Sequence, residues 1–165
     1  MSQELTLRFL EMAPRSPKVQ LHSLVNTSLL RNRKQLKFFI EKIFRTEGKS
    51  LRTVQFIFCS DNYLLKINRQ FLSRDYLTDV ISFDLSPDGS TEGEVYISLD
   101  RIRNNAAIFK RSVTEELHRV IFHGALHLCG YSDDTRKQKV WMAELEDLYL
   151  SKYFKRKVPR ITVPS

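Results

Sequence analysis

Residues 112–130 read SVTEELHRVIFHGALHLCG, and this stretch is the starting point for predicting the fold. Ser112, followed three residues later by Glu115, forms a capping-box pattern that is typical of the first turn of a helix. Gly130 is a residue type that commonly follows the last turn. The stretch therefore predicts one helix that begins after Ser112 and ends near residue 129.

Strands and helices are mixed irregularly around this helix. Alternation of apolar and polar residues predicts strands over 5–9, 19–22, 54–58, 78–84 and 94–98. Helical spacing of apolar residues and end signals predict further helices over 32–46, 60–71, 99–110 and 134–151. Because no regular strand–helix–strand alternation is present, we expect the α+β class, with a small mixed β-sheet packed by several helices.

Length and composition indicate a single domain. The chain has 165 residues, of which 42% are hydrophobic and 28% are charged, as in an ordinary globular protein. We expect residues 1–151 to form this domain and the basic segment 152–165 to be a flexible tail. No uncharged apolar run approaches the roughly 18 residues of a membrane span, and the first residues lack a signal-peptide pattern.

The cysteines and the net charge bear on location and partners. Cys59 and Cys129 are far apart and provide no disulfide framework, which fits a reducing compartment and favours a cytoplasmic location. Because no apolar run is long enough to span a membrane, we expect no membrane partner. The 27 Lys and Arg outnumber the 19 Asp and Glu, which gives a formal net charge of +8. A positive field attracts polyanions such as RNA, although the same charge could serve solubility alone.

Two histidines in the predicted helix form a candidate metal site. His123 and His127 are four residues apart, so their side chains differ by roughly 40° around the helix axis and project from one face. This spacing suits two ligands of one Zn²⁺, and either Asp133 or Asp134 could return as a third ligand after Gly130. The alternative is that both histidines are packing or surface residues that bind no metal. His118 lies on the opposite side of the helix and is expected to be a surface or structural residue.

A zincin-type peptidase is not favoured by the sequence. In the His-Glu-x-x-His arrangement, the Glu after the first histidine is the general base. Gly124 occupies that position here. The predicted helix can therefore hold a metal ion but does not supply its own base.

Three segments and one further residue together resemble one known family. Residues 123–131, HGALHLCGY, closely resemble the His-Gly-x-Leu-His-Leu-x-Gly-Tyr-Asp-His signature of the YbeY-type rRNA-processing endoribonucleases. Residues 78–83, TDVISF, and 93–98, GEVYIS, resemble two strands of that family, and Asn68 matches the residue that opens its preceding segment. The resemblance spans about residues 54–150. It implies one α+β domain, one zinc ion per chain and cleavage of single-stranded RNA, acting on the ribosomal small subunit in 16S rRNA 3′-end maturation and in ribosome quality control.

The chain departs from the family pattern at two sites. The family's third ligand is usually His, whereas the aligned residue here is Asp133, a carboxylate that zinc also accepts. The resemblance therefore implies a metal site of His123, His127 and Asp133. The family usually has a functional Arg where this chain has Leu72, and Arg69 and Arg74 on either side are candidates to replace it.

Two other functions remain open at this stage. One is a metallohydrolase with a peptide or small-molecule substrate, which Gly124 and the net positive charge disfavour. The other is a non-catalytic factor that binds rRNA or the ribosome and holds a structural metal ion. The leading interpretation is the metal-dependent endoribonuclease, with the basic helix over 31–45 as a further candidate to hold the RNA backbone.

Overall fold

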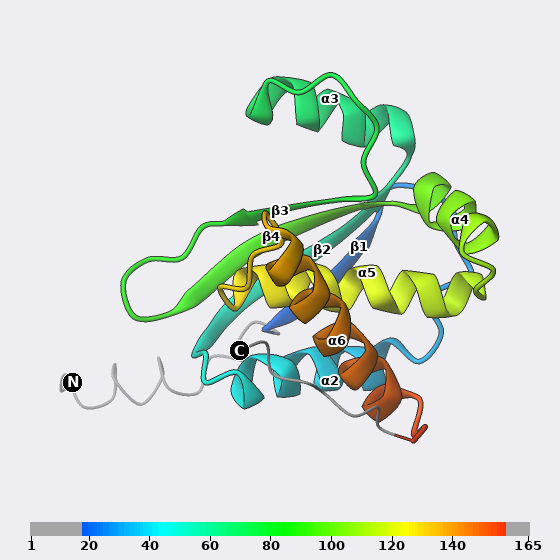
Figure 1. Ribbon diagram of the computed structural model, residues 1–165. Helices are drawn as coiled ribbons and strands as arrows, with labels where there is room; N and C mark the ends of the chain where they lie inside the picture. Colours follow the sequence, from blue (N-terminus) through cyan, green and yellow to red (C-terminus); the bar gives the residue numbers. More distant parts are fainter. Residues whose placement is uncertain (1–17, 158–165) are drawn as a thin grey trace, which may run out of the picture.

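The computed structural model describes residues 18–157 and shows a mixed sheet surrounded by helices (Figure 1). In chain order its elements are β1 Val19–Ser23, α2 Arg33–Thr46, β2 Leu51–Cys59, α3 Asp61–Leu72, β3 Val80–Asp84, β4 Thr91–Ser98, α4 Leu99–Ile108, α5 Val113–Leu128 and α6 Arg136–Tyr153. This confirms the predicted α+β class. The predicted strand over 5–9 and the end of the predicted tail, from residue 158, lie outside the described residues.

The sheet has four strands in the order β1-β2-β4-β3. Strands β1, β2 and β4 run parallel, whereas β3 pairs with β4 as an antiparallel hairpin. Phe56, at the centre of the sheet, lies between Leu21 of β1 and Val95 of β4. The hairpin therefore places the TDVISF segment at one edge of the sheet.

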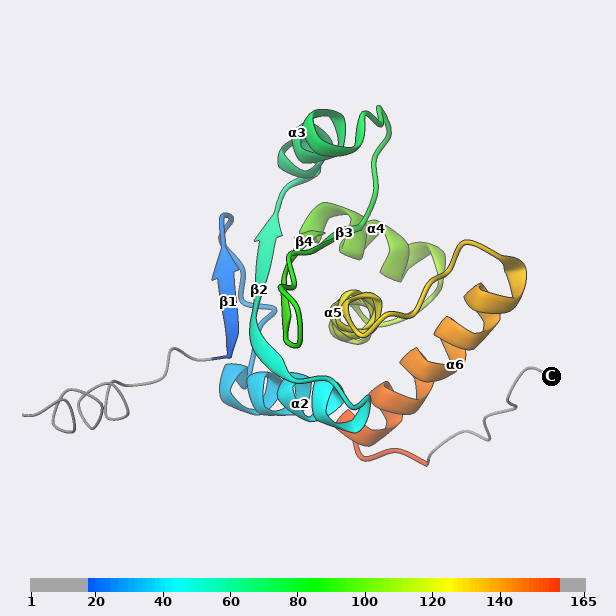
Figure 2. The ribbon, with the colours of Figure 1, turned by 90° about the vertical axis from the view of Figure 1, so that its left-hand side faces the viewer.

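Helix α5 packs closely across one face of this sheet, where two glycines allow the approach. A Cβ atom added to Gly124 would lie 2.5 Å from Cγ1 of Val95 in β4. A Cβ atom added to Gly93 in β4 would lie 2.7 Å from Cδ2 of Leu128 in α5. Helices α2 and α6 contact α5 in turn, so α5 is the central helix of the main core (Figure 2).

Helix α3 belongs to a second, smaller cluster on the other side of the sheet. Leu64 of α3 packs with Cys59 at the end of β2 and Ile81 of β3. The helix stands apart from the other helices in Figure 1, and the segment from 73 to 79 leads from it back to β3.

Helix caps explain several of the observed boundaries. The side chain of Ser112 accepts a hydrogen bond from the backbone of Glu115, as predicted for the start of α5. Thr135 and Gln138 form a full capping box that starts α6. Helix α6 continues to Tyr153, beyond the predicted end at 151, because the Tyr153 ring is buried and lies 5.0 Å from the ring of Phe39. Within residues 18–157, no helix is long and apolar enough to cross a membrane.

Candidate metal centre

A cleft of about 500 Å³ lies between α3, β3 and α5. Its walls come from the end of α3 and the segment after it, from β3, from α5 and from the loop after α5. The polar and charged residues in its lining are Asn68, Arg74, Thr78, Asp79, Ser82, Asp84, His123, His127 and Asp133. The structure thus brings the three residues of the implied metal site into one cleft.

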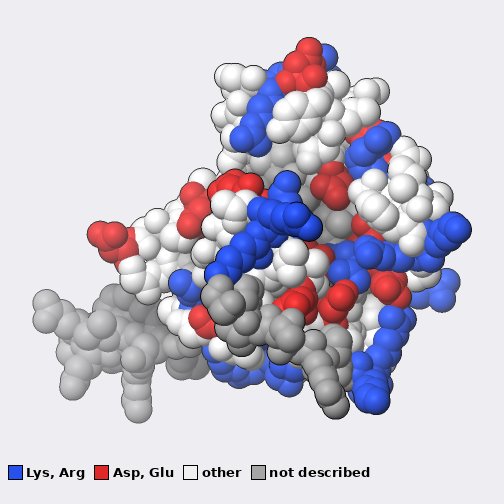
Figure 3. Space-filling view, in the orientation of Figure 1, with Lys and Arg blue, Asp and Glu red and all other residues white. Residues whose placement is uncertain are grey.

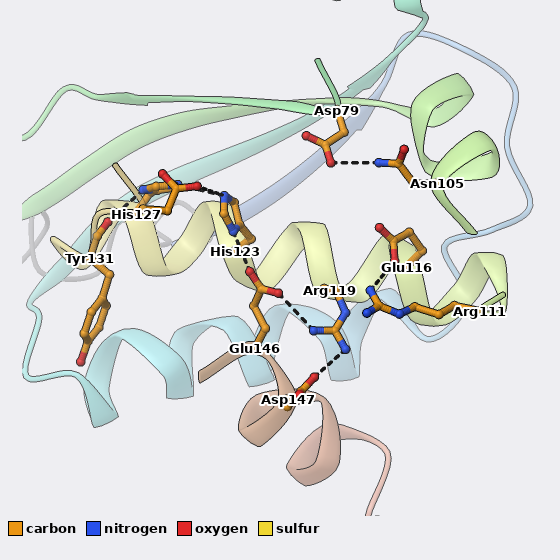
Figure 4. Close-up of polar contacts among 11 residues, drawn as sticks. Asp79, Asn105, Arg111, Glu116, Arg119, His123, His127, Tyr131, Glu146 and Asp147 are labelled. Carbon is orange, nitrogen blue, oxygen red and sulfur yellow. Dashed lines mark hydrogen bonds and ion pairs between the residues drawn. The ribbon is translucent and has the colours of Figure 1, made fainter. Parts of the chain in front are cut away.

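The two histidines point toward each other from successive turns of α5. Their Nε2 atoms are 2.9 Å apart and their ring centroids 4.4 Å apart. The Nδ1 atom of His123 lies 2.7 Å from Oε1 of Glu146, and that of His127 lies 2.9 Å from the carbonyl oxygen of Tyr131 (Figure 4). Both Nδ1 atoms are therefore directed away from the cleft and toward acceptors.

The loop after α5 brings one carboxylate to the histidine pair. Gly130 adopts a φ of +100°, which glycine tolerates, and the backbone N–H of Tyr131 donates to the carbonyl of Leu126, so the chain turns back over the helix end. The Asp133 carboxylate then lies 3.6 Å from Nε2 of His127 and 3.9 Å from Nε2 of His123. Asp134 is exposed and accepts a hydrogen bond from the Ser132 hydroxyl instead.

The donor atoms of this group suit a bound cation. A carboxylate and a carbonyl only accept hydrogen bonds, so both histidine Nδ1 atoms must carry the proton. In neutral imidazoles, both Nε2 atoms then carry a lone pair, and the two atoms face each other at 2.9 Å. Two such lone pairs repel each other unless a cation or a shared proton lies between them. The ligand-capable atoms of His123, His127 and Asp133 all lie within 4.8 Å of one another. A metal ion of the type that binds imidazole and carboxylate therefore fits this group.

A chain of charged contacts orients His123 through its Nδ1 atom, on the side of the ring away from the cleft. Glu146 of α6 accepts from His123 and also from Arg119, whose guanidinium donates to Asp147 as well. Burial lowers the pKa of His123, but the hydrogen bond to Glu146 and its negative charge outweigh this and raise the pKa above its usual value. A carboxylate on the outer nitrogen of a ligating histidine is a common means of fixing its orientation.

His127 has a different environment. Burial and the positive charge on neighbouring His123 lower its pKa, although the nearby Asp133 opposes this. Its Tyr131 partner is held by Glu47 at the end of α2, which accepts hydrogen bonds from the Tyr131 and Tyr149 hydroxyls. Glu47 therefore ties the loop that orients His127 to the end of α2 and to α6.

Asp79 is a cleft residue that the sequence argument did not single out. It lies just before β3, and its carboxylate accepts a hydrogen bond from Asn105 of α4. Burial raises its pKa, while the proximity of His123 lowers it in part. Asp79 is the second residue of the TDVISF segment, which indicates the family resemblance but does not by itself predict that Asp79 lies near the metal site. Glu146 gave no sequence signal, because it meets His123 only through the packing of α6 on α5.

The two candidate arginines are placed differently. Arg74 lines the cleft. Arg69 is not in the described lining and instead forms an ion pair with Asp75 at 2.6 Å. Leu72, at the family's Arg position, lines the cleft with an exposed side chain. The structure thus brings Arg74, but not Arg69, to the candidate metal centre.

The other predicted residues lie away from the cleft. No described residue of the basic helix α2 lines it, and Figure 3 shows basic and acidic side chains interspersed on this face of the molecule. His118 is buried with its ring 4.8 Å from that of Tyr153, which agrees with the structural alternative. Cys59 and Cys129 are free and buried, and burial raises the pKa of each thiol to about 12.

Two histidines and a carboxylate in an open cleft of an α+β domain are an arrangement typical of metal-dependent hydrolases. Comparison with known proteins narrows this class. The family model described as Endoribonuclease YbeY matches residues 20–154. A solved structure, that of TM1509 from Thermotoga maritima, is 29% identical with a TM-score of 0.61 and covers 83% of this chain and 89% of its own.

Curated relatives agree with the family model. Endoribonuclease YbeY of Cytophaga hutchinsonii is 46% identical over 123 residues, which are 74% of this chain and 86% of the relative. Endoribonuclease YbeY of Flavobacterium psychrophilum is 47% identical over 109 residues, which are 66% of this chain and 78% of the relative. The chain belongs to the YbeY endoribonuclease family.

Proposed function

We propose that this chain is a zinc-dependent endoribonuclease specific for single-stranded RNA, with His123, His127 and Asp133 as the zinc ligands. Membership of the YbeY family supports cleavage of RNA. The observation that carries the metal assignment is the convergence of both histidine Nε2 atoms and the Asp133 carboxylate in one cleft. Three protein ligands leave room for a water molecule or a substrate oxygen, as in catalytic zinc sites.

The residues of the cleft have separate roles in this proposal. When bound, zinc supplies Lewis acidity and a more acidic water molecule. Glu146 and the Tyr131 carbonyl hold the two imidazoles in the tautomer that leaves Nε2 free to bind the ion. Arg74 supplies positive charge to the cleft and attracts the RNA phosphates.

The biological substrate follows from the family resemblance. We propose that the chain acts on the 3′ end of precursor 16S rRNA in the small ribosomal subunit and takes part in ribosome quality control in the cytoplasm. The net charge of +8 supports a polyanionic partner. Among the described residues that line the cleft, Arg74 is the basic one.

The metal and the activity can be tested on the same protein. Elemental analysis should find one zinc ion per chain, and replacing both His123 and His127 with Ala should abolish it. The wild type should cleave a labelled single-stranded oligoribonucleotide and spare the same sequence in a duplex, and chelation should stop the cleavage. His22→Ala, at an exposed histidine on β1, is the matched control and should change neither result.

Each possible result of these experiments tests a different part of the proposal. Full zinc content in the double variant would refute the ligand assignment. Bound zinc and RNA binding without cleavage would indicate a non-catalytic factor with a structural metal ion. Cleavage that survives complete removal of zinc would refute the zinc dependence.

A further inference from the structure

Two large apolar side chains are exposed on one wall of the cleft. Leu72, at the end of α3, is 36% exposed, and Tyr76, in the segment that follows, is 54% exposed. Both line the same cleft as the candidate metal centre. Single exposed apolar residues are ordinary on a protein surface, but two that share a cleft with polar groups are typical of a ligand site.

The backbone that carries Tyr76 is held firmly in place. Ser73 ends α3 in the left-handed conformation, with a φ of 53°, and the backbone N–H of Arg74 donates to the carbonyl of Asn68 at 3.2 Å. The Asn68 side chain, only 1% exposed, donates from Nδ2 to the carbonyl of Tyr76 at 2.9 Å. The ring of Tyr76 is thus presented from a fixed backbone, which reduces the entropy lost when a ligand binds.

The segment that carries Tyr76 also carries a cation, Arg74, whereas the carboxylates of the cleft, Asp79, Asp84 and Asp133, come from the β3 segment and from the loop after α5. Arg74 lines the cleft and makes no ion pair within residues 18–157. The neighbouring carboxylate, Asp75, is already neutralised by its ion pair with Arg69. A tyrosine ring and an arginine in the same cleft suit a nucleotide, because a nucleotide combines a flat base with a phosphate.

We propose that Tyr76, flanked by Leu72, is a stacking site for one nucleobase of the RNA substrate, and that Arg74 contacts an adjoining phosphate. This inference rests on the proposed function and specifies how the same cleft recognises its substrate. An unpaired base can leave its neighbours and stack on Tyr76, whereas a base inside a duplex is held in its own stack. The site therefore supplies a physical reason for a preference for single strands.

Binding of a fluorescently labelled oligoribonucleotide tests the proposal. With chelator present to prevent cleavage, Tyr76→Ala should weaken binding by the loss of one base–aromatic stack, about 5- to 150-fold. Tyr76→Phe keeps the ring and should bind like the wild type. Tyr63→Ala removes an exposed tyrosine of α3 outside the described cleft lining and should have no effect. In the zinc-loaded enzyme, Tyr76→Ala should raise KM more than it lowers kcat.

A second oligonucleotide distinguishes stacking from other effects. An abasic site at the position that contacts Tyr76, found by moving it along the strand, should weaken binding to the wild type but not to Tyr76→Ala. If the wild type cleaves RNA but Tyr76→Ala binds as tightly, the stacking site is refuted and the proposed function stands. If the wild type neither binds nor cleaves RNA, both fail. A wild type that binds RNA equally well with an abasic site at every position would also refute the stacking site.

Discussion

Glu146→Gln should weaken zinc binding although Glu146 is not one of the proposed ligands. The Glu146 carboxylate lies 2.7 Å from Nδ1 of His123 and is largely buried in α6. Gln has nearly the same shape but lacks the negative charge that orients and polarises the imidazole. Loss of such an outer partner typically costs 10–100-fold in metal affinity, or about 1.4–2.7 kcal/mol. Competition with a chromophoric chelator measures the affinity directly.

Asp147→Asn is the matched control for this variant. Asp147 also binds the Arg119 guanidinium, at 2.6 Å, but makes no described contact with His123. Its side chain is 51% exposed, so the loss of this ion pair should cost at most about 1 kcal/mol of stability and leave zinc affinity unchanged. Equal zinc affinities for Glu146→Gln and the wild type, or equal losses in the two variants, would refute the reasoning.

The same variant has a pH signature with a definite sign. In the metal-free protein, Glu146 raises the pKa of His123, although burial opposes this. As the pH falls, His123 is therefore protonated earlier than it would be without Glu146, and its proton competes with zinc for Nε2. Glu146→Gln removes that contribution and lowers the pKa. The variant should therefore bind zinc more weakly than the wild type at neutral pH, but lose proportionally less affinity as the pH falls.

Three further predictions concern the surroundings of the site. Asp133→Ala should reduce zinc affinity far more than Asp134→Ala, because only Asp133 lies beside the histidine pair, and the same chelator competition would measure this. Burial lowers the pKa of His118, so the free energy of unfolding should fall as the pH drops below about 6.5, and His118→Phe should flatten that dependence in urea titrations. Because the hydrogen bond to Glu47 is the main cause that raises the pKa of Tyr131 to about 12, Glu47→Gln should lower that pKa in a spectrophotometric titration.

The features that the sequence predicted well depend on local patterns. The central helix and its two histidines follow from caps and from helical spacing, which involve residues only a few positions apart. The hairpin that forms β3 and β4 likewise follows from alternation on either side of a turn. These signals are local, so they are present in the sequence before any tertiary contact is known.

The features that the sequence did not predict depend on packing. Glu146 of α6 meets His123 of α5 across 23 positions, and Asp79, just before β3, meets Asn105 of α4 across 26, so both contacts form only when separate elements pack together. The difference between Arg69 and Arg74 depends on the turn at Ser73, where a positive φ at a residue other than glycine gives no clear sequence signal. Only the folded chain shows which arginine reaches the cleft.

Gly124 connects the fold to the chemistry of the site. In a zincin this position carries the general base, but here it faces β4, where an added Cβ would lie 2.5 Å from Cγ1 of Val95. A Glu at 124 would have to displace the helix that carries both histidines, because Val95 is fully buried and β-branched. The close packing of α5 on the sheet therefore prevents α5 from supplying a base at this position. Within the described cleft lining, the carboxylates other than the proposed ligand Asp133 are Asp79, just before β3, and Asp84, the last residue of β3. In this fold the proposed metal ligands and the other carboxylates of the cleft thus come from different elements, which the packing of α5 against β3 and β4 holds together.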